Sequence, residues 1–202
     1  RSIFGADPYE KGEIKLHGRP VHFRHTGEAI ANKIGLIPEN RKTQGLVQIL
    51  PVWENMTMVA LDKCKKNGVI NYGVIRETCE LYKKSLNVKT PSINTVIQNL
   101  SGGNQQKVII AKWLFRDCDI LLIDEPTQGI DVMVKEEIYK IIRNLADEGK
   151  SMIVVSSELD ELLRICDNII VMFDGKEVMT SSKENFNPDK ILSVSVTGRN
   201  ES

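Results

Sequence analysis

Three short apolar runs in the second half of the sequence, at residues 120–123, 152–155 and 169–172, constrain the fold more than any other feature. Each is rich in Ile, Val or Leu, lacks polar alternation and is bounded by polar residues, which is typical of parallel strands buried on both faces. The segments between them carry apolar residues at helical spacing, from Val134 to Leu145 and from Leu159 to Cys166. This alternation predicts β-α-β-α-β over residues 119–173, and therefore an open parallel sheet with right-handed crossovers.

The first half of the chain is organised differently. Residues 13–23 predict a hairpin, Thr26 is expected to cap a short helix that runs through Lys33, and residues 34–37 predict a strand that Pro38 ends. Residues 51–97 contain helical patterns and no convincing strand, which predicts a helical subdomain inserted into an α/β core formed by residues 1–50 and 98–202. After the last apolar run we expect a hairpin turn at Asp174 and Gly175, and a final helix from about Pro188.

Composition excludes several classes of protein. The 27 basic and 27 acidic side chains cancel, so nothing steers the whole chain toward nucleic acid or an acidic membrane. No apolar run is long enough to span a bilayer and no signal peptide pattern is present, so we expect a cytoplasmic location. The cysteines include no CxxC pair, which argues against a zinc or disulfide framework, and no histidine follows His25.

The strongest chemical signal begins at the sequence Leu-Ser-Gly-Gly-Asn-Gln-Gln-Lys, residues 100–107, which opens an apolar helix. Gly102 and Gly103 leave the backbone N–H groups of the first turn unobstructed, and the helix dipole favours an anion there. Ser101 either adds a hydroxyl donor or caps the helix itself.

A second signal follows the apolar run 120–123, which ends in Asp124, 23 residues after Ser101, and Glu125. Open α/β sheets bind ligands beyond the carboxyl ends of their strands. One carboxylate there can hold Mg²⁺ through water while its neighbour polarises an attacking water.

Together these two motifs resemble the signature loop and Walker B motif of an ABC-transporter ATPase domain, with residues 129–131 as the D-loop. The signature variant and the sequence Pro-Glu-Asn-Arg-Lys at residues 38–42 are most similar to bacterial monosaccharide importers of the ribose, galactose and xylose type. Their ATPase subunit carries two fused ABC domains, and this chain resembles the second. The resemblance implies a single P-loop NTPase-like α/β domain with a parallel sheet core, an inserted helical subdomain and a partial N-terminal antiparallel region.

The resemblance also implies site residues and partners. ATP and Mg²⁺ are the expected cofactors, with Glu125 as the catalytic residue and Asp124 on the metal. Nucleotide contacts are expected from Ser101, Gly102, Gly103, Gln105, Glu39, Asp131 and Ser157. The implied partners are transmembrane permease subunits, a second ABC domain fused on the N-terminal side and, indirectly, a sugar-binding protein, with no nucleic acid. The implied place is the inner face of the cell membrane.

Three departures from the family pattern stand out. No Walker A motif is present. The sequence Gly-Lys-Ser at residues 149–151 resembles the end of that motif, but it leads from a predicted helix into a strand, whereas a P-loop leads from a strand into a helix. We therefore expect the Walker A motif just before Arg1, and a truncated domain that binds ATP poorly alone. Glu39 occupies the position of the Q-loop glutamine, and it cannot donate as an amide does. Ser157 occupies the position of the switch histidine, which predicts weakened catalysis even in an intact site.

Two other readings stay open: a soluble ABC ATPase of translation or DNA repair, and a non-catalytic module that only docks a partner. Residues 51–97 are too short for the long coiled-coil arm of the repair proteins. A second signature motif upstream of Arg1 would favour the transporter.

Overall fold

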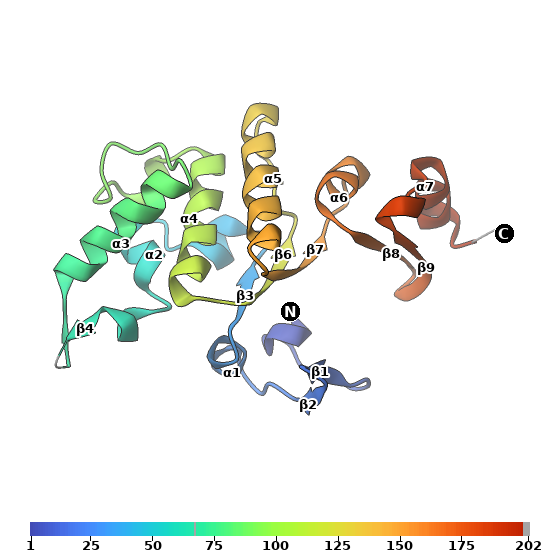
Figure 1. The fold of residues 1–202 in the computed structure, drawn as a ribbon, viewed down its shortest axis with the longest axis horizontal. Coiled ribbons are helices and arrows are strands. Elements are labelled where there is room, and N and C mark those ends of the chain that lie inside the picture. The colour runs from blue at the N-terminus through green and yellow to red at the C-terminus, as the bar shows by residue number, and fades with distance from the viewer. Residues whose placement is uncertain (67, 200–202) are drawn as a thin grey trace. The chain divides into compact units, whose positions relative to one another are not determined.

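The computed structural model describes residues 1–66 and 68–199. The chain divides into two compact units, Arg1–Ile153 and Val154–Ser202, and each is described by itself. Figure 1 shows the order of the elements along the chain.

The first unit is built on the parallel pairing of β3 (Ile34–Ile37) with β6 (Ile120–Asp124), in a register that runs from Ile34 opposite Ile120 to Ile37 opposite Ile123. The strand order in the sheet is β3-β6-β7, where β7 spans Ser151–Val155. Helix α5 (Val132–Asp147) connects β6 to β7, as the apolar stripe from Val134 predicts. The predicted α/β core with a parallel sheet is therefore confirmed.

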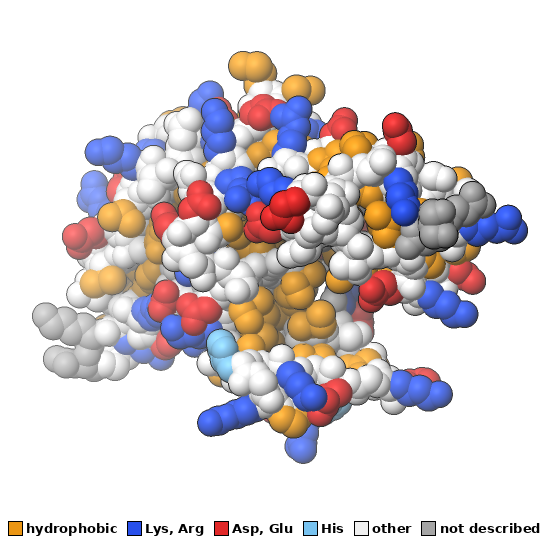
Figure 2. Space-filling model, turned by 45° about the vertical axis from the view of Figure 1, so that its right-hand side comes forward, with side chains coloured by type: hydrophobic (Ala, Val, Ile, Leu, Met, Phe, Trp, Pro, Cys, Tyr) orange, Lys and Arg blue, Asp and Glu red, His pale blue; other side chains and the backbone are white. Residues whose placement is uncertain are grey.

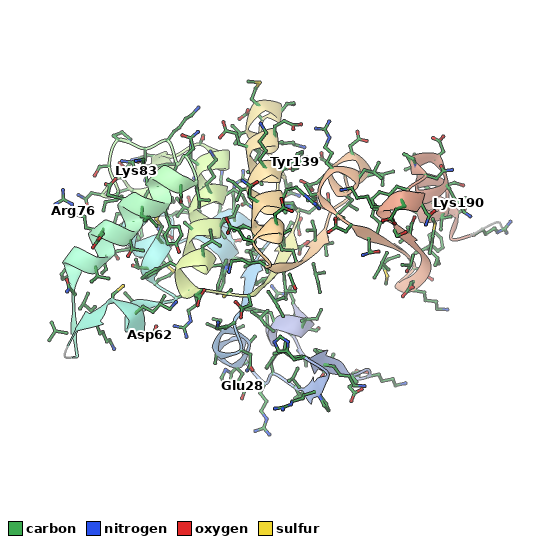
Figure 3. All side chains as sticks on the ribbon, viewed as in Figure 1. Glu28, Asp62, Arg76, Lys83, Tyr139 and Lys190 are labelled. Atoms are coloured by element: carbon green, nitrogen blue, oxygen red, sulfur yellow. The ribbon has the colours of Figure 1, made fainter. Side chains whose placement is uncertain are left out.

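Helix α4 (Gly102–Arg116) is the most buried helix of this unit, with Val108, Ile109 and Ala111 completely inaccessible to solvent. It packs against β3, where a Cβ at Gly35 would lie 2.8 Å from the Trp113 ring. Only glycine lets the strand approach that ring so closely. The other end of α4 is tied down by Arg116, whose Nη1 donates to both carboxylate oxygens of Asp62 at 2.7 and 2.8 Å (Asp62 is labelled in Figure 3).

The N-terminal region contains the predicted hairpin. A short helix, η1 (Ser2–Phe4), precedes β1 (Ile14–Leu16), which pairs antiparallel with β2 (Arg19–Val21). His17 and Gly18 between the strands both have positive φ, as a tight hairpin turn requires. Helix α1 (Thr26–Ala31) follows, and its N-cap is His25 rather than Thr26.

Between β3 and α4 the chain is mostly helical. It contains the π-helix η2 (Arg41–Gly45), α2 (Val52–Thr57), η3 (Leu61–Cys64), α3 (Tyr72–Ser85) and η4 (Ile97–Asn99). A small antiparallel pair, β4 (Lys65–Lys66) with β5 (Val69–Ile70), also lies here, so the prediction that this segment holds no strand is wrong. Two residues per strand are too few to show a periodic pattern in a sequence.

The second unit contains α6 (Leu159–Ile165), β8 (Asn168–Phe173), β9 (Lys176–Ser182), η5 (Lys183–Asn185) and α7 (Pro188–Thr197). Strand β8 pairs antiparallel with β9 in a sheet of its own, so the third parallel strand predicted at residues 169–172 is not found. The predicted turn at Asp174 and Gly175, both with positive φ, joins the two strands. Ile169 and Val171 of β8 pack with Ile191 and Val194 of α7 to form a small core.

Basic and acidic side chains are interspersed over the visible face of the molecule in Figure 2, in keeping with the balanced charge. Among the described residues, none of the helices has the length and apolar character that crossing a bilayer requires.

Candidate functional site

The acidic residues of the site follow two neighbouring strands of the first unit. Because Ile37 lies opposite Ile123 in a parallel pairing, Glu39 and the pair Asp124 and Glu125 leave the same edge of the sheet. This is the carboxyl edge, where open α/β sheets bind ligands.

The pKa of the Asp124 carboxylate, one of this group, is affected by its surroundings. Burial raises the pKa of Asp124, and the negative charges of Glu39 and Glu125 raise it further. Glu125 has φ of 48°, a left-handed conformation that a side chain other than glycine seldom adopts. Such backbone geometry costs energy and is concentrated at functional sites.

A divalent cation suits this group of carboxylates in one respect, since it would offset their mutual repulsion. Within residues 1–66 and 68–199, however, no group of three or more His, Cys, Asp or Glu side chains could enclose a metal ion. Mg²⁺ is commonly held by only one or two carboxylates together with substrate phosphates and water. The residues therefore fit Mg²⁺ that arrives with a nucleotide, and not a metal held by the protein alone.

At the start of α4, where an anion site is predicted, the Ser101 hydroxyl does not cap the helix. Ser101 is the N-cap residue, but its side chain accepts no hydrogen bond from the helix backbone. Its Oγ instead accepts from Nδ2 of Asn104 at 2.9 Å, while Oδ1 of Asn104 accepts from the backbone N–H of Lys89 at 2.7 Å. Asn104 thus orients Ser101, and a hydroxyl proton remains for an anion.

Both signature glycines lie where a side chain would collide with a neighbour. A Cβ at Gly102 would lie 2.5 Å from Nη2 of Arg41, and one at Gly103 would lie 2.2 Å from Cγ1 of Val134. The second contact is the more restrictive, because Val134 is a β-branched residue inside a helix whereas the guanidinium is the end of a long side chain. Gly103 therefore lets α4 and α5 approach each other.

Gln105 does not extend toward the surface in this structure. Its side chain is 3% exposed, and Nε2 donates to the carbonyl oxygens of Ile97 and Leu100, both at 3.2 Å. Its amide thus holds the turn that precedes the signature loop.

Two residues that the sequence analysis gave no role connect the site. Arg41 donates from Nη1 to the carbonyl oxygen of Gln128 at 2.5 Å and from Nη2 to that of Gly129 at 3.3 Å. Gln128 in turn donates from Nε2 to Oε1 of Glu39 at 3.3 Å. The only hint in the sequence was that Arg41 lies two residues after Glu39, since contacts with residues near 128 leave no local pattern.

The remaining two predicted residues, Asp131 and Ser157, lie in the segments that lead into α5 and α6. Asp131 is the N-cap of α5, and Oδ1 accepts from the backbone N–H of Val134 at 3.1 Å. Ser157 is exposed in the second unit, between β7 and α6. Of the predicted site residues, Glu39, Asp124 and Glu125 thus lie at one sheet edge, and Gly102 lies against Arg41.

Comparison with known sequences gives a consistent family. The profile of the family described as ABC transporter matches residues 1–128. A protein of Halalkalibacterium halodurans named as a ribose/galactose/methyl galactoside import ATP-binding protein is 44% identical over 191 residues, which are 95% of this chain and 37% of that protein. The arabinose import ATP-binding protein of Vibrio parahaemolyticus is 43% identical over 202 residues, 100% of this chain and 40% of that protein. The chain thus spans well under half the length of these relatives.

Solved structures agree on the fold. An ATP-binding cassette in a dimeric post-hydrolysis state, bound to ADP and Pi, matches with a TM-score of 0.74 at 22% identity, covering 91% of this chain and 78% of that one. An ATP-binding cassette in its ADP conformation matches with a TM-score of 0.74 at 19% identity, covering 97% and 77%. At such identities the likeness concerns the fold alone. The sequence relatives and the family profile, which covers more than half of the chain, show that this chain belongs to the ABC transporter family.

Proposed function

We propose that this chain is part of the ATP-binding and ATP-hydrolysing component of a bacterial sugar importer, in which hydrolysis drives carbohydrate transport across the membrane. The observation that carries the proposal is the placement of three carboxylates, Glu39, Asp124 and Glu125, at the carboxyl edge of β3 and β6, where burial and the charges of the other two raise the pKa of Asp124. The names of the relatives support import of ribose, galactose or arabinose as the class of transport.

Asp124 and Glu125 have different roles in this proposal. Asp124 ends the buried strand and would hold Mg²⁺, which supplies positive charge to the phosphates when bound. Glu125, one residue beyond the strand, would orient a water molecule and accept its proton as it attacks. Glu39, joined to Gln128, adds a further acceptor on the same edge.

The signature loop would serve a nucleotide held by another ABC domain. The Ser101 hydroxyl and the N–H groups at the start of α4 are donors for a phosphate, and the helix dipole favours the negative charge. The site would then be shared, with each domain completing the site of the other.

The second ABC domain would be fused on the N-terminal side, with the Walker A segment of this domain just before Arg1. The coverage of only 37–40% of the relatives supports this, since those proteins are long enough for two such domains. Strands β7 and β8 also expose alternate apolar side chains, Ile153 and Val155 on one and Ile170 and Met172 on the other. A further strand and helix would cover such surfaces. Transmembrane permease subunits would hold the assembly at the inner face of the membrane, with a sugar-binding protein outside it.

The test is ATP-driven sugar uptake by the full-length subunit, reconstituted with its permease in vesicles. Glu125→Gln should lower ATP turnover by about 10²-fold or more, as expected for loss of a general base, while ATP still binds. Glu10→Gln, a change from carboxylate to amide at an exposed position, is the control and should leave turnover unchanged.

One observation favours a second candidate, a module that binds a partner without hydrolysing ATP at its own site. Serine at position 157 and glutamate at position 39 replace the histidine and glutamine expected there. Unchanged turnover in Glu125→Gln would support this alternative, because the other domain would then carry out all of the hydrolysis.

A further inference from the structure

The guanidinium group of Arg41 joins three parts of the first unit that are far apart in the sequence. It extends from the start of η2 and donates to the carbonyl oxygens of Gln128, just before the D-loop, and Gly129, the first D-loop residue. The same group lies against Gly102, the first residue of α4. One side chain thus touches the loop after β3, the D-loop and the signature loop.

This arrangement is not an ion pair. Among the described residues, the hydrogen-bond partners of the Arg41 guanidinium are backbone carbonyl oxygens, and partial burial lowers its pKa. Its Nε is buried and has no hydrogen-bond partner among the described residues. Even a partly buried cation gains little by losing water without meeting a carboxylate, so the position of Arg41 requires a reason other than charge pairing. The geometry of the planar guanidinium supplies that reason, because its two Nη atoms together reach two successive carbonyl oxygens.

Gly102 is the residue that makes room for the Arg41 guanidinium. Only hydrogen at that position leaves space for Nη2, because a Cβ would lie 2.5 Å from it. The signature glycine therefore has a role within its own domain, besides leaving its backbone N–H open.

The segment that carries Arg41 is itself held at both ends. Oδ1 of Asn40 accepts from the backbone N–H of Thr43 at 3.2 Å. At the far end, Nζ of Lys112 in α4 donates to the carbonyl oxygen of Gly45 at 2.7 Å. A short element fixed at both ends can place a side chain accurately.

We propose that Arg41 is a positioning residue that fixes the D-loop, residues 129–131, against the start of the signature helix, so that the two present a single rigid surface to a nucleotide. The inference rests on the proposed function and deepens it. The hydrogen-bond donors of the shared site keep their spacing only while the Arg41 guanidinium is bound to the two carbonyl oxygens. Arg41 itself touches no substrate in this role.

The test compares Arg41→Gln and Arg41→Lys in the full-length subunit assembled with its permease. Loss of the Arg41 guanidinium should lower kcat for ATP hydrolysis by about tenfold or more, because small misplacements of reacting groups slow the reaction. KM should stay within about twofold. Arg41→Lys, which can reach one carbonyl oxygen but not two, should retain more activity than Arg41→Gln. Lys42→Gln, the exposed neighbour of the same charge, should match the wild type.

A double-mutant cycle separates positioning from a general loss of stability. Gly102→Ala should displace the guanidinium and so reproduce most of the loss in Arg41→Gln. The double variant should then be little worse than either single variant, because the second change removes nothing further. Losses that multiply, or a loss of kcat explained by a parallel loss of folded protein in thermal unfolding, would overturn the inference.

Hydrogen exchange gives a readout that does not depend on hydrolysis. In Arg41→Gln, amides of residues 101–104 and 128–132 should exchange faster, while those of β8 and β9 should not change. If the wild type hydrolyses no ATP but these two segments loosen together, the proposed function fails and the positioning role stands. If neither segment changes, the positioning role is wrong whatever the activity.

Discussion

The Nζ of Lys112 donates a hydrogen bond to the carbonyl oxygen of Gly45 at 2.7 Å from a side chain that is only 5% exposed. It also lies 5.2 Å from the centre of the Trp113 ring. Burial lowers the pKa of Lys112 from 10.5 to about 8. The folded protein therefore holds this proton less strongly than the unfolded chain does.

The free energy of unfolding should consequently depend on pH through Lys112. Between pH 8 and 10.5 the unfolded chain binds more protons at this site, so the stability contributed here rises with pH across that window. Relative to Lys112→Met, wild type should gain about 3 kcal/mol from pH 7 to pH 10.5. Chemical denaturation at several pH values measures this. The comparison of Lys42→Met with wild type should show no such trend, and a flat difference for Lys112→Met would contradict the prediction.

A second buried lysine has a different partner. Lys107, 1% exposed, donates to the carbonyl oxygen of Asn87 at 2.9 Å and forms an ion pair with Glu137 at 2.5 Å, which ties α4 to α5. Glu137→Gln should lower the free energy of unfolding by about 1–3 kcal/mol, the range for a hydrogen bond to a charged group. Glu148→Gln, an exposed position at the end of the same helix, is the control.

The pH dependence of this pair has the same sign as that of Lys112, but it falls in the acid range. The hydrogen bond from Lys107 lowers the pKa of Glu137 below its ordinary 4.5. The stability it contributes is present above that value and is lost as the pH falls through the lower value of the folded state. The difference between wild type and Glu137→Gln should therefore shrink in acid, and a difference that grows would show that this pair is not its cause.

The two signature glycines should differ in their tolerance of alanine. Gly103→Ala would place a Cβ 2.2 Å from Val134, so α4 and α5 must move apart, and we expect a loss of about 1–3 kcal/mol, as for overpacking in a core. Gly102→Ala meets only the end of the Arg41 side chain and should cost less stability. Thermal unfolding of both variants provides the comparison, and equal losses would argue against this packing.

The 202 residues by themselves should bind MgATP weakly. Phosphate binding in this family depends on the backbone amides and lysine of the Walker A motif, and the sequence contains no such motif. We expect a Kd of about 1 mM or weaker, a binding free energy of about −4 kcal/mol at best. Calorimetry that found micromolar affinity would reveal a phosphate site elsewhere in the chain.

The parallel core could be predicted from the sequence because its signals are local. Residues 120–123 lack alternation, and the stripe from Val134 to Leu145 matches α5 over its length. The pairing of β8 could not be predicted in this way. Ile169 to Met172 resembles a strand buried on both faces, but its burial alternates and its partner is the strand that follows the turn at Gly175.

The candidate site was predictable where motif and chemistry coincide, and not where distant segments meet. Asp124 ends a buried strand and Glu125 follows it, which the residue order alone reveals. Arg41 and Gln128 are 87 positions apart, and their hydrogen bond depends on a tertiary contact that no periodicity encodes. The buried position of Gln105 was also missed, because a polar residue near a glycine pair suggests a ligand more readily than a turn.

The close approach of Gly103 to Val134 has a consequence for how the sequence can evolve. Gly103 has only hydrogen as its side chain, and a methyl group of Val134 fills the space beside it. A larger side chain at either position therefore requires a smaller one at the other. Across related sequences, a side chain at position 103 should therefore occur together with alanine or glycine at position 134. A selection for second-site suppressors of Gly103→Ala should return changes at Val134 before changes at Glu39, Asp124 or Glu125.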